Sequence, residues 1–167
     1  MALSLLAGAS IAQATEQAPA QALTDCRVPG LRNSVKCGVA QRALDATRPD
    51  GPKIDVHFVV VPAMARRKLP DPVFLLAGGP GQSAIGVAPQ TMALFNRLNN
   101  RRDIVFVDQR GTGRSAPLEC PDSSRESLAE QSDAEQHFQQ LMLCKAQLNR
   151  LPYIHAESDL GNFTTTG

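Results

Sequence analysis

An apolar segment that runs directly into a glycine loop constrains the fold of this chain more than any other feature. "VFLLA" at 73–77 has the composition of a buried strand, and "GGPG" at 78–81 follows it without a break. A second short strand, "DIVFVD" at 103–108, is likewise followed by a glycine-containing loop, "QRGTGRS". Between them, the apolar residues of 84–99 partly follow helical spacing, and Pro89 is expected to break the first half of that helix. Strand, loop, helix, strand and loop in this order predict an α/β sheet.

Two further elements flank this unit. The nearly unbroken apolar run "KIDVHFVVVPA" at 53–63 predicts a buried strand. Ser132 and Glu135 have the spacing of a capping box ahead of "QHFQQLMLCKAQL". The apolar stripe of that amphipathic helix is expected to be a packing surface.

The first residues are typical of an exported chain. "MALSLLAGASIAQA" is apolar and ends in Ala-Gln-Ala, which fits signal-peptidase cleavage, although no basic residue precedes the apolar run. We therefore expect a signal peptide at 1–14, with a disordered tail as the alternative, and an unfolded linker at 15–25. The segment is shorter than the roughly 20 apolar residues of a membrane-spanning helix. The remaining residues, 26–167, are expected to form the folded part, in a periplasmic or secreted protein.

Four cysteines, Cys26, Cys37, Cys120 and Cys144, contain no C-x-x-C pair and have no histidine at zinc-finger spacing. In an exported chain they predict two disulfides, and of the three possible connectivities local closure favours Cys26 with Cys37 and Cys120 with Cys144. Free buried thiols are the alternative if the chain is not exported.

Charge and composition exclude some classes of partner. The net charge is +1, and the short basic clusters at 66–68 and 101–102 have no interleaved aromatic residues, which speaks against nucleic-acid binding. The sequence predicts no metal, no cofactor and no stable membrane span, and it leaves the oligomeric state open.

The glycine loop itself admits three interpretations. Ser83 is a poor nucleophile candidate, because an elbow requires Gly-x-Ser-x-Gly and Ile85 occupies the second glycine position. The pattern G-x-G-x-x-A at 79–84, with Asp108 ending the next strand, is that of a dinucleotide site, but Pro80 removes an N–H from the turn. The third interpretation is an oxyanion hole, in which glycine N–H groups stabilise charge on a carbonyl oxygen.

"GGPG" at 78–81 and "DQRGTGRS" at 108–115, in this order, resemble the prolyl aminopeptidase and tripeptidyl aminopeptidase-like branch of the α/β-hydrolases. Ala77 stands where the family usually has His, as in its secreted members. The similarity extends to "PLEC" at 117–120, to Cys144 and to "NFTTTG" at 162–167. The resemblance implies the amino-terminal part of an α/β-hydrolase sheet, truncated before the nucleophile strand.

The resemblance also implies roles for individual residues. Gly79 would supply an oxyanion N–H and Gly78 would shape the loop. The remaining loop residues would support it structurally: Pro80, Gly81, Asp108, Gln109, Arg110, Gly111, Gly113 and Ser115. Direct contact with substrate is the alternative for Asp108, Gln109 and Arg110.

The catalytic Ser, Asp and His of the family would lie beyond Gly167, so the present chain is expected to be inactive by itself. His57, His137 and His155 follow no nucleophile elbow and are expected to be structural or surface residues. The predicted function is serine-type hydrolysis through an acyl-enzyme. The substrate is a peptide, or a small amide or ester, and the bond cleaved follows an amino-terminal residue or a short amino-terminal peptide. A dinucleotide-binding oxidoreductase domain and a secreted, disulfide-bonded binding module without catalysis are the alternatives.

Overall fold

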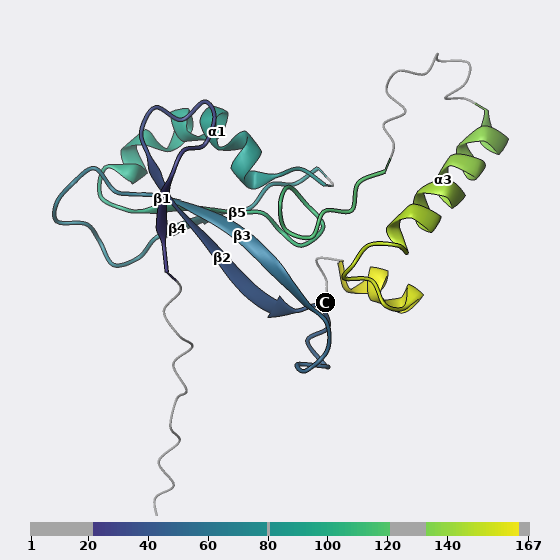
Figure 1. The fold of residues 1–167 in the computed structure, drawn as a ribbon. Coiled ribbons are helices and arrows are strands. Elements are labelled where there is room, and N and C mark those ends of the chain that lie inside the picture. The colour runs from purple at the N-terminus through teal and green to yellow at the C-terminus, as the bar shows by residue number, and fades with distance from the viewer. Residues whose placement is uncertain (1–21, 80, 121–132, 164–167) are drawn as a thin grey trace, which may run out of the picture.

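The computed structural model describes residues 22–79, 81–120 and 133–163, and shows one sheet with one helix packed on it (Figure 1). The strands are β1 (Thr24–Cys26), β2 (Val35–Ala43), β3 (Lys53–Val61), β4 (Val73–Leu75) and β5 (Ile104–Val107). The helices are α1 (Ala84–Asn99), α3 (Ala134–Leu148) and the 3-10 helix η2 (Glu157–Phe163).

The sheet is mixed, with strand order β1-β2-β3-β5-β4. Its first three pairings, β1 with β2, β2 with β3 and β3 with β5, are antiparallel. Only β4 and β5 run parallel, connected by α1 as a single β-α-β unit. The predicted α/β-hydrolase fold is therefore wrong for the described residues, because the long antiparallel ribbon of β2 and β3 occupies the place of alternating strands and helices.

Local predictions around the glycine loop agree well with the structure. The three predicted strands are present as β3, β4 and β5, each shorter than the predicted segment. The helix at 84–99 is present over its full length, but the expected break at Pro89 is wrong. Pro89 lies inside α1 and packs against Gly30, where an added Cβ would come within 2.9 Å of the proline ring. Gly30 thus provides room for the proline ring.

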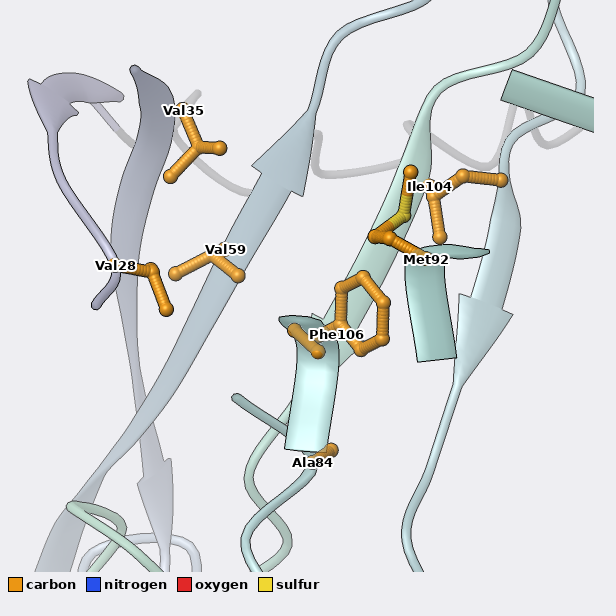
Figure 2. Packing of buried hydrophobic residues seen from close by; sticks show 8 residues of the cluster. Val28, Val35, Val59, Ala84, Met92, Ile104 and Phe106 are labelled. Atoms are coloured by element: carbon orange, nitrogen blue, oxygen red, sulfur yellow. The ribbon is translucent and has the colours of Figure 1, made fainter. Parts of the chain in front are cut away.

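The main core lies between α1 and the sheet, as Figure 2 shows. Ile104 and Phe106 of β5 contribute fully buried side chains, and Met92 of α1 packs against the same cluster. The other buried members of this cluster are Val28, Val35, Val59, Ala84 and Ala88. Burial of apolar surface stabilises a fold by about 25 cal/mol per Å² removed from water. The burial of this cluster therefore holds α1 against the strands.

A smaller cluster joins the carboxyl-terminal segment to the sheet. Leu44, Ile54 and Ala116 are buried there, and Tyr153 and Phe163 pack against them. The Tyr153 hydroxyl donates a hydrogen bond to the carbonyl oxygen of Pro117 at 2.5 Å, and burial raises the pKa of this phenol.

Helix α3 lies apart from the sheet and has no buried side chain (Figure 1). Its predicted packing stripe is therefore wrong within the described residues, since Phe138, Leu141 and Met142 are each at least half exposed. The helix is capped by Asp133, whose carboxylate accepts the N–H groups of Glu135 and Gln136. Ser132, the predicted cap, lies outside the described residues.

Both predicted disulfides are confirmed. Cys26 is bonded to Cys37 across β1 and β2, and Cys120 is bonded to Cys144 of α3. Two disulfides are compatible with an exported protein. Strand β1 begins at Thr24, inside the predicted linker 15–25, whereas the predicted signal peptide lies outside the described residues.

Candidate functional site

The two glycine-containing loops meet at one end of the sheet. Strands β4 and β5 are parallel neighbours, so the loop at 78–81 and the loop at 108–115 both leave the carboxyl ends of their strands. Ligands of open α/β sheets bind at this end of parallel strands. The location alone therefore makes this pair of loops the candidate site.

Asp108 holds the two loops together. Its side chain is 1% exposed, and its Oδ1 accepts hydrogen bonds from the Ser83 hydroxyl at 2.7 Å and from the Ile85 N–H at 3.0 Å. Its Oδ2 accepts the Arg114 N–H at 3.3 Å from its own loop. A carboxylate beside the amino terminus of α1 is also favoured by the helix dipole. Asp108 thus fixes the start of α1, and with it the glycine loop, to β5.

Ser83 is the N-cap of α1. Its Oγ accepts the Gly86 N–H at 2.9 Å while its hydroxyl proton is directed to Asp108. Both hydrogen-bonding functions of the hydroxyl are therefore occupied by structural partners. On the sequence alone, Ser83 is weighed as a nucleophile and not as a helix cap. A serine directly before a helical segment is nevertheless a helix-start signal, and it could have indicated this role.

Gly113 provides the space that this arrangement needs. It has a φ of +54°, and a Cβ added there would lie 2.0 Å from Oδ2 of Asp108 and 2.8 Å from Oγ of Ser83. Only glycine leaves the carboxylate in place, because any side chain atom would occupy its position.

The second loop is tied to β3 through backbone groups of His57. The His57 N–H donates to Oγ of Ser115 at 2.8 Å, and the His57 carbonyl accepts the Asp108 N–H at 3.0 Å. Ser115 is fully buried. The backbone of β3 therefore determines where the loop begins and where it ends.

Three further predicted support residues make contacts within the described residues. Arg110 donates from Nη1 to the carbonyl oxygens of Leu44 and Asn162, which attaches the loop to the carboxyl-terminal segment. The Gln109 carbonyl accepts hydrogen bonds from the N–H and the hydroxyl of Thr112, and the Gly111 N–H donates to the Ser115 carbonyl. These hydrogen bonds all join the second loop to itself or to other parts of the chain.

The first loop, in contrast, is open to solvent. Gly78, Gly79 and Gly81 are exposed, and their N–H groups donate to no other described residue. Gly79 has a φ of +139° and Gly81 a φ of +83°, a region that side chains rarely adopt. Pro80 lies outside the described residues. The loop therefore combines exposed N–H donors with a backbone conformation that requires glycine.

An open pocket of about 440 Å³ lies beside the second loop but is not lined by the first. Its lining includes His57, Arg114 and Tyr153. Burial, followed by the positive charge of Arg114, lowers the pKa of His57. His137 is exposed on α3, and His155 is exposed with its N–H donating to Asp159. Among residues 22–79, 81–120 and 133–163, no cluster of His, Cys, Asp or Glu has the size to hold a metal ion.

A scan against known protein families and a search of curated proteins both find no match to this chain. None of the helices in the described segments is long and apolar enough to cross a membrane.

Proposed function

We propose that the loop at 78–81 binds the oxyanion in a serine-type, aminopeptidase-like hydrolase. In such a reaction a serine attacks the carbonyl carbon of an amide or ester, and negative charge develops on the carbonyl oxygen. Gly79 is the residue assigned to donate its N–H to that oxygen. The observation that carries the proposal is the exposed Gly79, with a φ of +139° and an N–H that bonds no other described residue.

The anchoring of the loop supports this role. Oxyanion stabilisation is effective when the donors are already positioned before the reaction, since no energy is then spent on reorienting them. Asp108 and Ser83 bind the start of α1 two residues after Gly81, so the loop is held at its carboxyl-terminal side. At its amino-terminal side the loop continues from β4, which is paired with β5.

The dinucleotide alternative receives less support from the same contacts. A pyrophosphate would need free N–H groups at the amino terminus of α1, but those of Ile85 and Gly86 are bonded to Asp108 and Ser83. A ribose would need an accessible carboxylate, and Asp108 is 1% exposed. Titration with NAD and NADP tests this alternative directly, and a stoichiometric complex would favour it over hydrolysis.

The first experiment treats the 167-residue chain with a fluorophosphonate. We expect no labelling, because the resemblance places the nucleophile after Gly167 and the Ser83 hydroxyl is engaged by Asp108. The gene is then read past the codon for Gly167, where the proposal expects Gly-x-Ser-x-Gly after a short helix and a strand. Stoichiometric labelling of the present chain would contradict the assignment of the nucleophile.

The second experiment measures hydrolysis of aminoacyl and short peptidyl amides by the protein expressed from its complete gene. Alanine keeps the backbone N–H but is strained at the φ of +139° of Gly79, so Gly79→Ala should turn the N–H away from the oxyanion. We expect kcat to fall by about a hundredfold to a thousandfold with a smaller change in KM, as for an oxyanion hole that has lost one donor. Gly81→Ala is the matched control, because Gly81 shares the positive φ and an added Cβ there meets open space. Equal losses in both variants would show that backbone strain, and not oxyanion binding, is responsible.

Export is part of the same proposal. Two disulfides and the Ala-Gln-Ala ending of the apolar segment at 1–14 support it. Amino-terminal sequencing of the native protein should begin near residue 15. Recovery of native protein with residues 1–14 attached and four free thiols would refute export.

A further inference from the structure

The end of the molecule opposite the glycine loop is built from two chain segments. The connection from β3 to β4 runs back beside the carboxyl end of α1, and Figure 1 shows both at the same end of the sheet. The N–H groups of Met64, Ala65 and Leu69 donate to the carbonyl oxygens at 99, 100 and 101, at 2.7–3.1 Å. These hydrogen bonds make one continuous surface of the two segments.

The positive charge on this surface is largely uncompensated. Arg66 and Arg67 from the connection and Arg97 and Arg101 from α1 and its end are exposed. None of these four guanidinium groups takes part in a hydrogen bond or ion pair with another described residue. The acids of this end are already engaged, since Asp103 binds Lys68 and Asp71 binds Arg102. Because the whole chain carries a net charge of only +1, this is a local concentration of charge.

Exposed aliphatic side chains lie among these arginines. Leu94 is 83% exposed and Leu98 is 40% exposed, one helical turn apart on α1, and Met64 in the connection is 69% exposed. Arg97 follows Leu94 by three residues on α1, so the two are neighbours on the helix surface. Arg101 lies in the turn after α1, where its N–H donates to the Leu98 carbonyl at 3.3 Å. We refer to Met64, Arg66, Arg67, Leu94, Arg97, Leu98 and Arg101 together as the basic end.

We propose that the basic end docks the protein reversibly onto a membrane surface rich in anionic phospholipid. Arginines attract the phosphate-bearing headgroups, and the aliphatic side chains enter the boundary between headgroups and acyl chains. The long stems of the arginines allow their charged groups to stay at headgroup level while the leucines lie deeper.

The composition of the basic end favours a membrane over a nucleic acid. Binding of single strands relies on aromatic side chains on which bases stack. The basic end has no aromatic member and exposes Leu94, Leu98 and Met64 instead, which a phosphate backbone would leave in water. The docked orientation also leaves the loop at 78–81 accessible, because α1 begins beside that loop and ends at the basic end.

The experiment is co-sedimentation of the 167-residue chain with vesicles. We expect binding to vesicles in which a third of the phosphatidylcholine is replaced by phosphatidylglycerol, weak binding to phosphatidylcholine alone, and loss of binding as salt is raised. Arg66→Gln with Arg67→Gln should weaken binding about thirtyfold, at roughly fivefold for each basic side chain lost near the surface. Leu94→Gln should weaken binding to the same vesicles without changing its dependence on salt.

The matched control removes two positive charges elsewhere. Arg42 on β2 and Arg150 after α3 are also exposed, and Arg42→Gln with Arg150→Gln should bind like the unchanged chain. Circular dichroism is recorded for all variants so that only folded proteins are compared. Three results would each overturn the proposal. They are equal binding to both kinds of vesicle, an equal loss of binding in the control variant, and binding to single-stranded RNA at a salt concentration where vesicles are not bound.

Discussion

Replacing Gly113 by alanine should disrupt the contact between the two loops more than any other single methyl group. The added Cβ would lie 2.0 Å from Oδ2, 2.6 Å from Cγ of Asp108 and 2.8 Å from Oγ of Ser83. Real Cβ atoms essentially never approach other heavy atoms within 3.0 Å, so the Asp108 carboxylate must move. The carboxylate is buried and cannot move into solvent without leaving its present partners.

The magnitude follows from two contributions. The φ of +54° costs an alanine about 1–2 kcal/mol. Displacement of Asp108 weakens three hydrogen bonds, from Ser83, Ile85 and Arg114, and hydrogen bonds to a charged group contribute about 1.5–3 kcal/mol each. Because the displaced carboxylate keeps part of this through new partners or water, we expect a loss of about 4–6 kcal/mol in the free energy of unfolding.

Gly81→Ala separates these contributions. Gly81 has a φ of +83°, but nothing lies within 4 Å of an added Cβ, so this variant should lose only about 1 kcal/mol. The assay is urea unfolding followed by circular dichroism, with the free energy extrapolated to water. If Gly113→Ala loses no more than Gly81→Ala, the assignment of Gly113 as the space for the Asp108 carboxylate is refuted.

A double-mutant cycle tests the same reasoning without depending on absolute stability. Ser83→Ala alone should cost about 1–2 kcal/mol through loss of the N-cap and of the bond to Asp108. In the Gly113→Ala background the same substitution should cost less, because the displaced carboxylate has already left the Ser83 hydroxyl and only the N-cap to Gly86 remains to be lost. Strict additivity would mean that the carboxylate stays where it is.

Three other predictions concern the rest of the fold. The Thr47 hydroxyl, followed by the Arg48 guanidinium, lowers the pKa of Asp45 from 3.8 to about 2. The ionised Asp45 therefore contributes its full stabilisation above about pH 4 and loses it as the pH falls through about 2. Asp45→Asn should make the urea midpoint less dependent on pH in this acid range. Replacing Cys26 and Cys37, 11 residues apart, by alanine should lower the free energy of unfolding by about 2–3 kcal/mol, and an unchanged urea midpoint would contradict this. Replacing Cys120 and Cys144 should leave the unfolding of the sheet nearly unchanged, since α3 has no buried side chain, and hydrogen exchange of β3 and β5 amides measures this.

The strands next to the glycine loops could be predicted because their own residues carry the signal. "KIDVHFVVV", "VFL" and "IVFV" are rich in β-branched and aromatic side chains, which favour strands wherever they are buried. In strand β2 this signal is weak, because Val35 and Val39 are its only β-branched residues and Gly38, Ala40, Gln41 and Arg42 separate or follow them. It forms because it pairs along its length with β3, and Gly38 leaves room for the Phe58 ring. Such a strand depends on its partner and cannot be predicted from its own composition.

The fold class was mispredicted for a related reason. One β-α-β unit is present around the glycine loop, and its sequence pattern is the basis on which the amino-terminal part of an α/β-hydrolase sheet is predicted. Two of the antiparallel strands, β1 and β2, come from the region before residue 53, where the sequence carries few strand signals. The order of elements along the chain does not indicate which edge of the sheet is joined by a strand whose sequence pattern is weak.

At the site, the residue types were predicted and the contacts were not. Two loops at the ends of β4 and β5 could be expected to meet, because parallel strands bring their carboxyl ends together. That Asp108 would accept hydrogen bonds from Ser83 and Ile85 depends on the exact start of α1, and helix boundaries are uncertain by a residue or two. The roles of Gly79 and Gly78 stay predictions.

The chain contains one tyrosine and no tryptophan, so the ultraviolet fluorescence of the protein comes chiefly from Tyr153. Its hydroxyl is bonded to the Pro117 carbonyl, and its ring centre lies 6.0 Å from that of Phe163. The emission therefore reports whether the carboxyl-terminal segment is seated on the core, with no label attached. Its change during denaturation, compared with circular dichroism of the sheet, shows whether segment and sheet come apart in one step or in two.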